Sequence, residues 1–203
     1  MADVPIITRN MPKQARAKAR IRIILNATDT LLKESSLENI TTTAIARSAG
    51  IPVGSVYQYF EDKNDILQQL YRAAYKDVEE QVKAAQAGLA PNLSFAEINR
   101  QLLQCFWQTA RSHPTFRVLT RWANREYSFI EVTPDAESGL ADLITETFKV
   151  SGVEVEPSRK DAVLTTTVTL VSVLVDAAIE EENEHKAEAL IHELATVLSS
   201  YLG

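Results

Sequence analysis

The stretch from Thr41 to Lys63, "TTTAIARSAGIPVGSVYQYFEDK", constrains the fold most because it holds two very short apolar segments around one tight turn. The hydroxyl of Thr41 can cap a helix over residues 42–49. Gly50 can adopt the positive φ at which that helix ends. Pro52 is tolerated at the first position of the next helix because no N–H is needed there. Two short helices joined by a glycine-containing turn are the helix-turn-helix pattern.

The second of these helices, expected over residues 52–60, has one apolar face. Val56 and Phe60 are four residues apart and are expected to face the rest of the domain. The outer and flanking faces then carry Val53, Ser55, Tyr57 and Gln58. Glutamine can read an adenine edge, and serine and tyrosine hydroxyls can bond to phosphate. The pattern predicts a helix that is presented to the major groove of DNA. The alternative is a corner between two helices that serves only for packing.

Three neighbouring positions extend this surface. Gly54 allows a close approach of the backbone, and Lys63 suits a phosphate contact at the start of the following helix. Tyr57 and Tyr59 lie about 200° apart around a helix of 3.6 residues per turn. The two tyrosines therefore cannot serve one surface, and one of them is expected in the core with its hydroxyl at the edge.

Helical periodicity continues along the rest of the chain. Apolar residues recur at spacings of three and four, and proline and glycine divide the segments. Helices are expected over residues 15–35, 63–88, 94–113, 114–132, 134–151, 157–182 and 184–202. Alternation typical of a strand occurs only at 150–155, where Gly152 interrupts it. The prediction is an all-α protein of about nine helices, with a three-helix helix-turn-helix domain over residues 1–62 and a larger helical domain over 63–203.

The last two expected helices are unusually apolar. The first of them has more apolar residues than one helix face can hold: Val163, Leu164, Val168, Leu170, Val171, Val173, Leu174, Val175, Ala177, Ala178 and Ile179. The apolar residues of the second are Leu190, Ile191, Leu194, Val197 and Leu198. A helix that is apolar on more than one face lies either at the centre of its own domain or against a second subunit.

The net charge of −6 is unevenly distributed. Residues 1–60 carry eight basic and four acidic side chains, whereas residues 61–203 carry 13 basic and 23 acidic ones. A basic head on an acidic body indicates that one end meets a polyanion. An unstructured basic tail kept for solubility is the alternative interpretation of the same charges.

Catalytic and metal-binding patterns are absent from the sequence. His113, His185 and His192 are scattered, no HExxH, GxSxG, P-loop or GxGxxG occurs, and Cys105 lies among apolar residues as a small core side chain. The chain shows no signal peptide and no apolar run of about 18 residues. We therefore expect a cytoplasmic protein that is not an enzyme, has no cofactor or metal and does not contact a membrane.

The segment "TTTAIARSAGIPVGSVYQYFEDKNDIL" resembles the signature of the TetR/AcrR family of bacterial transcriptional regulators. The matching residues are Thr41, Ile45, Ala46, Ala49, Gly50, Ile51, Gly54, Ser55, Tyr57, Tyr59, Phe60, Lys63 and Leu67. The preceding "RIRIILNATDTLLKES" is similar to the first helix of that family, so the resemblance covers about residues 16–67. Pro52, Val53 and Ala44 depart from the usual residues, which makes the binding surface less basic and removes a capping box.

This resemblance implies a ligand-responsive regulator, most simply a repressor that binds a palindromic operator as a dimer and is released by a small molecule. The DNA-binding residues it implies, together with those argued above, are Thr42, Thr43, Val53, Gly54, Ser55, Tyr57, Gln58, Tyr59 and Lys63. The homodimer would form through residues 157–202 as a four-helix bundle. The effector-binding residues it implies are Phe106, Trp107, Phe116, Arg121, Trp122, Arg125 and Tyr127, although aromatic residues at helical spacing are more often core residues.

Two other classes of protein stay open at this point. One is a small-molecule-binding or enzymatic all-α protein with a vestigial head, which would not bind DNA sequence-specifically. The other is a nucleoid-type protein that uses the same head with weak sequence preference.

Overall fold

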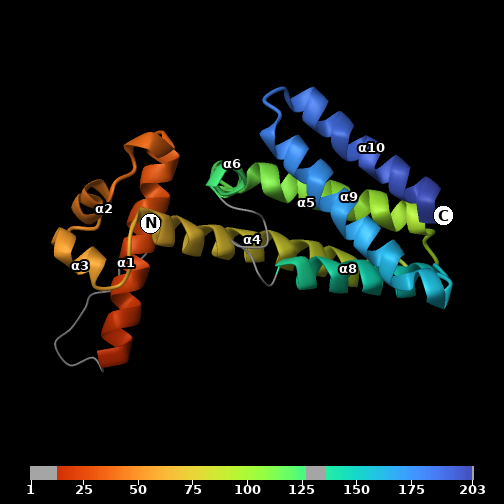
Figure 1. Cartoon of the computed structure of the whole chain (residues 1–203), viewed down its shortest axis with the longest axis horizontal. Coiled ribbons are helices and arrows are strands. Elements are labelled where there is room, and N and C mark those ends of the chain that lie inside the picture. Colours follow the sequence, from red (N-terminus) through yellow and green to blue (C-terminus); the bar gives the residue numbers. More distant parts are fainter. Residues whose placement is uncertain (1–12, 127–135, 203) are drawn as a thin grey trace. The chain divides into compact units, whose positions relative to one another are not determined.

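The computed structural model describes residues 13–126 and 136–202, and within these ranges the chain is all-α (Figure 1). Nine α-helices and two short 3-10 turns make up the regular structure of the described residues, which confirms the predicted fold class. The only strand-like stretch of the sequence forms no strand: residues 150 and 151 end a helix, and residues 153–156 have no regular structure.

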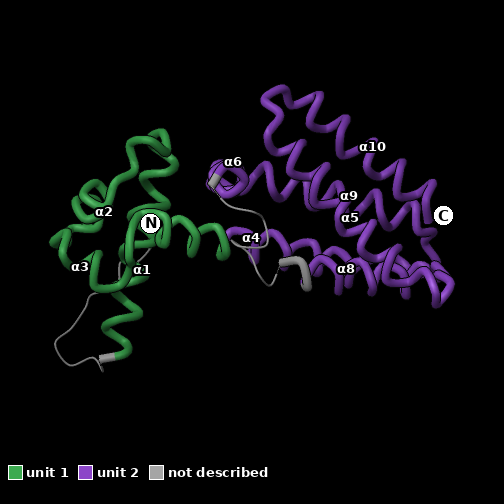
Figure 2. The backbone as a smooth tube through the Cα atoms, in the orientation of Figure 1, with its two compact units in different colours: residues 1–73 green, residues 74–203 purple. Residues whose placement is uncertain are grey.

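The chain divides into two compact units, residues 1–73 and 74–203, each described separately below (Figure 2). The division falls inside α4 (Lys63–Ala87), a helix of 25 residues. The boundary expected from the sequence, between residues 62 and 63, coincides with the first residue of α4. The first turns of this helix therefore pack with the N-terminal unit.

The first unit contains α1 (Lys13–Glu34), η1 (Leu37–Asn39), α2 (Thr42–Ser48), α3 (Val53–Tyr57) and the beginning of α4. Helix α2 packs against both α1 and α3. The apolar core side chains with no exposed surface are Ile24, Ile45, Val56, Ile66 and Leu67. These residues come from all four α-helices, so the three-helix head and the start of α4 share one small core.

Local sequence explains how α2 and α3 begin and end. The Thr41 hydroxyl accepts a hydrogen bond from the Ala44 N–H at 3.1 Å, and Gly50 has a φ of +64°, as the sequence predicted. Pro52 is a correction: it precedes α3 as the N-cap, with φ −60° and ψ 142°, instead of being its first helical residue. Helix α3 is also shorter than the expected 52–60: it ends at Tyr57, and the Tyr59 N–H bonds to the Val56 carbonyl only three residues back.

The second unit contains the rest of α4 and five further α-helices. These are α5 (Phe95–Ser112), α6 (Phe116–Glu126), α8 (Ala136–Ser151), α9 (Lys160–Glu180), preceded by η2 (Pro157–Arg159), and α10 (Glu184–Leu202). Helix α10 packs against α5 and α9, and α9 also contacts α6 and α8. A reciprocal capping box between Ser94 and Glu97 begins α5.

Helix α9 buries only part of its apolar surface in this unit. Val163, Val168, Val175 and Ile179 are buried, whereas Val173 is 59% exposed. The segment Pro157–Glu180 is long and apolar enough to span a membrane. In this structure, 33% of its most apolar 18-residue stretch is buried. This property is weak evidence for a membrane span, because a helix at the centre of a soluble helical bundle shares it.

Replacing Gly50 by alanine should loosen the α2–α3 turn. A left-handed conformation costs an L-residue about 1–2 kcal/mol, so hydrogen exchange at the Ile45 and Val56 amides should accelerate roughly 5- to 30-fold. Gly54→Ala is the matched control, since Gly54 lies inside α3 without a positive φ and an added Cβ would meet nothing within 4 Å. Equal protection in the two variants would contradict the proposed role of Gly50.

Candidate functional site

The exposed face of α3 is determined by the two side chains that anchor this segment. Val56 and Phe60 are 0% and 2% exposed, which confirms their predicted inward orientation. The side chains of Val53 and Ser55 are consequently half-buried at the flanks, and Gly54, Tyr57 and Gln58 are exposed. Of the residues in this segment predicted to bind DNA, the structure thus leaves Gly54, Tyr57 and Gln58 exposed and Val53 and Ser55 partly accessible.

Tyr57 makes the contact that links α3 to α2. Its hydroxyl lies 2.9 Å from the Thr42 hydroxyl, and the tyrosine is 56% exposed. Two hydroxyls at one exposed point can still accept or donate a further hydrogen bond to a phosphate oxygen. The sequence identified both residues but not this pairing, since they are 15 positions apart.

The remaining predicted DNA-binding residues lie at the ends of the neighbouring helices. Thr43 is exposed on the first turn of α2, and Tyr59 is half-buried after α3. Lys63 is the first residue of α4 and is half-buried. Asp62 caps this helix by accepting from the Asp65 N–H at 2.9 Å, so Lys63 stands beside a carboxylate.

The aromatic residues predicted for effector binding lie mainly in the core of the second unit. Trp107, Phe116 and Trp122 are at most 4% exposed. Phe106 is half-buried and packs edge-on against Phe116, with ring centroids 6.4 Å apart. Tyr127 lies outside the described residues.

The two arginines predicted as polar anchors lie in different surroundings. Arg121 donates from Nε to the Ile179 carbonyl at 3.1 Å and from Nη2 to the Glu180 carbonyl at 3.3 Å. Arg117, one turn earlier on α6, donates to the Glu181 carbonyl at 3.2 Å. These donors satisfy carbonyl groups that the last turn of a helix otherwise leaves unpaired, so α6 caps the end of α9. Arg125 is exposed.

Asp176 is a half-buried acid at the same α6–α9 contact. Desolvation raises the pKa of its carboxyl from 3.8 to about 6, a hydrogen bond from Asn124 opposes this rise and the charge of Glu180 adds to it. Sequence reasoning did not find Asp176, because a single acid on an apolar helix gives no pattern. No group of three or more His, Cys, Asp or Glu side chains in the described ranges could hold a metal ion.

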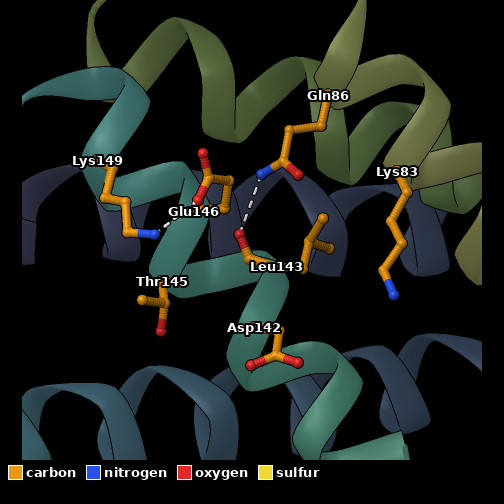
Figure 3. A pocket seen from close by; sticks show the side chains of 7 residues that line it. All are labelled: Lys83, Gln86, Asp142, Leu143, Thr145, Glu146 and Lys149. Atoms are coloured by element: carbon orange, nitrogen blue, oxygen red, sulfur yellow. Dashed lines mark hydrogen bonds and ion pairs between the residues drawn. The ribbon is translucent and has the colours of Figure 1, made fainter.

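A hollow of about 390 Å³ lies between α4 and α8, and we call it the α4–α8 hollow (Figure 3). Its lining residues are Lys83, Gln86, Asp142, Leu143, Thr145, Glu146 and Lys149. Sequence reasoning missed this site, because charged residues at helical spacing are typical of a solvated face.

Two family patterns match most of the chain. The pattern described as bacterial regulatory proteins, tetR family, matches residues 24–70, and the one described as tetracyclin repressor-like, C-terminal domain, matches residues 94–202. A similar protein is the HTH-type transcriptional regulator BetI of Serratia proteamaculans, 28% identical over 153 residues, which are 64% of this chain and 77% of that protein. BetI of Burkholderia pseudomallei is 26% identical over 180 residues, covering 76% and 92% of the two chains.

Solved structures share the fold at low sequence identity. A TetR-family regulator from Pectobacterium atrosepticum superposes with a TM-score of 0.73 at 15% identity, covering 94% of this chain and 96% of that one. The fatty acid degradation regulator FadR from Bacillus halodurans gives a TM-score of 0.61 at 18% identity, with 88% and 94% covered. At these identities the likeness concerns the fold alone.

The raised pKa of Asp176 predicts a pH dependence of stability. Because the folded state holds this proton more tightly than the unfolded state, the contribution of Asp176 is present below about pH 4 and is lost as pH rises through about 6. At about 1.4 kcal/mol for each pKa unit, the loss is at most about 3 kcal/mol. Asp176→Asn should flatten this part of the profile.

Urea unfolding from pH 4 to 7, followed by the fluorescence of the buried Trp107 and Trp122, measures this effect. Glu182→Gln, which removes an exposed carboxylate just beyond α9, is the control and should keep the slope. A profile unchanged by Asp176→Asn would show that this carboxyl does not titrate as argued.

Proposed function

Because this chain belongs to the tetR family of bacterial regulatory proteins, we propose that it represses transcription by binding a palindromic operator as a dimer and is released by a small molecule. The observation that carries the proposal is the pair of family matches, which covers both the DNA-binding head and the helical body. The chain is a DNA-binding, ligand-responsive regulator, and neither a nucleoid-type protein nor an enzyme is favoured. Regulators of this family are soluble proteins, and we place this one in the cytoplasm.

DNA binding is proposed for the exposed edge of α3 and its neighbours. Gln58 and Ser55 would contact base edges, while the paired hydroxyls of Tyr57 and Thr42 would contact one phosphate. Gly54 has open space around it, which supports a close approach of the DNA backbone. The remaining proposed contacts are Thr43, Val53, Tyr59 and Lys63.

Dimerisation is proposed through residues 157–202. The apolar side chains that α9 and α10 leave exposed support it: Val173 is 59% exposed, Val197 43% and Tyr201 42%. A second copy would cover this surface in a symmetric interface, on the order of 2,000 Å² in total. A dimer would also supply two copies of α3 for two half-sites, about 34–36 Å apart on DNA.

Effector control is proposed to act through α4, which begins at the head and continues into the body. An effector that favours the DNA-incompetent position of this helix would lower operator affinity, typically by a coupling of about 1–3 kcal/mol. His113, which follows α5, supports a connection from α6 to α4. Its Nδ1 accepts a hydrogen bond from the N–H of Phe116, the first residue of α6, at 3.2 Å. Its Nε2 lies 3.8 Å from the carboxylate of Asp77 on α4. The aromatic residues and arginines named above remain predicted effector contacts.

Selection of bound sequences from random DNA tests the proposed function, and two variants separate base from phosphate contacts. Gln58→Ala should relax the preference at one base pair by about 1–3 kcal/mol. Tyr57→Phe should weaken binding about equally on all sequences, because a phosphate contact carries no base information. Gln104→Ala, an exposed glutamine on α5, is the control.

The salt dependence of the same binding provides an independent measurement. Affinity for the selected operator should fall steeply as salt increases, through counterion release. Recovery of no preferred sequence, or an affinity that barely changes between low and moderate salt, would refute this role of the head.

Val173→Arg should convert the dimer into monomers, because a charge would then lie in the proposed apolar interface. Sedimentation at micromolar concentration measures the change. Val150→Arg is the matched control, since Val150 is 51% exposed on α8, outside the proposed interface. Leu194 would be a poorer test position, because it is fully buried in its own chain and a charge there would damage the subunit. A monomeric unmodified protein would exclude this assembly.

A further inference from the structure

The walls of the α4–α8 hollow are tied together by hydrogen bonds. Gln86 Nε2 on α4 donates to the Leu143 carbonyl at 3.0 Å and to Thr147 Oγ1 at 2.8 Å, both on α8. Thr147 in turn donates to the Leu143 carbonyl at 2.8 Å. These three hydrogen bonds join α4 and α8 beside the hollow.

Charges of both signs line this hollow. Lys83 comes from α4, and Asp142, Glu146 and Lys149 come from α8 (Figure 3). Lys149 pairs with Glu146 at 2.9 Å, and Lys83 pairs with Glu79 at 2.7 Å. Within the described part of the chain, the Asp142 carboxylate has no hydrogen bond or ion pair, so it is available to pair with a cationic group of a ligand.

The two ion pairs do not prevent the lysines from binding a ligand. Both pairs lie within single helices at the surface, where such pairs contribute about 0–1 kcal/mol. An ammonium group has three donors, and each of these lysines uses one of them in its pair. Lys83 and Lys149 can therefore donate a hydrogen bond to the carboxylate of a ligand at little cost in free energy.

Leu143 adds an apolar surface to the same hollow. Its side chain packs against the buried cluster of Val82, Ile98 and Leu102, against which Phe106 packs as well. A short carbon chain can lie on this surface between the charged groups. The volume of about 390 Å³ is near the lower end of ligand pockets, roughly 300–1,000 Å³, and so favours a small molecule.

We propose that the α4–α8 hollow binds a small dipolar molecule, with its ammonium group toward Asp142 and its carboxylate toward Lys83 or Lys149. A singly charged cation could pair with Asp142 alone and a singly charged anion with a lysine alone, whereas a dipolar molecule can make both pairs at once. This inference rests on the proposed function. Bound between α4 and α8, the molecule would act as effector by changing the position of α4, the helix that begins at the head.

Calorimetric titration of the full-length protein without DNA tests the ligand class. The probes are glycine, 4-aminobutyrate and 6-aminohexanoate, each compared with the carboxylate and the amine of equal chain length. At least one dipolar probe should bind tenfold more tightly than both of its singly charged counterparts. If every dipolar probe binds no better than its counterparts, the inference is wrong.

Variants then locate the binding. Asp142→Asn should weaken binding of the best dipolar probe at least tenfold, and so should Lys83→Gln or Lys149→Gln. Glu154→Gln and Lys186→Gln are the matched controls, since both side chains are exposed outside the hollow. Unchanged binding in Asp142→Asn, with or without an effect in the controls, would place the ligand elsewhere and overturn the proposal.

Operator release is measured separately, so the two proposals can fail independently. The best dipolar probe should lower affinity for the selected operator about 5- to 150-fold, and the operator should weaken probe binding by the same factor. Dipolar binding without operator release would overturn the effector role of the hollow. Failure to select any operator would overturn the proposed function, whatever the calorimetry shows.

Discussion

The helical body depends on the burial of one face of α9 against its neighbours. Val163, Val168, Val175 and Ile179 lie inside, where α9 contacts α6, α8 and α10. The carbonyls of Ile179 and Glu180 at the end of α9 accept hydrogen bonds from Arg121 on α6, and the carbonyl of the C-cap residue Glu181 accepts one from Arg117. The exposed positions of α9 include Val173, at 59%, so the same helix is both central in one chain and the proposed contact with a second.

The head is arranged around a much smaller core. Burial of Val56 and Phe60 leaves the other side of α3 accessible, and the contact between Tyr57 and Thr42 fixes α3 against α2. A short helix of five residues would not persist alone. The proposed readout of DNA thus depends on packing within the head, and its proposed control would act through α4, whose far end lies beside the α4–α8 hollow.

Sequence reasoning predicted most of the head and less of the body. The cap at Thr41, the turn at Gly50 and the inward positions of Val56 and Phe60 were predicted correctly. The interpretation of the aromatic residues was less informative, since apolar side chains on several helices look alike whether they fill a core or line a cavity. The charged lining of the α4–α8 hollow gave no signal, because its residues are spaced like those of any solvated helix face.

By itself, the sequence determined the all-α class, the cap at Thr41 and the turn at Gly50, because these depend on residues within one or two turns of each other. Only the tertiary structure decided which side chains meet across longer distances. Tyr57 and Thr42 are 15 positions apart, Gln86 and Leu143 are 57 apart, and Arg121 and Ile179 are 58 apart. The physical reason is that these contacts form only after the apolar faces of separate helices have packed, and the spacing along the chain does not specify that packing.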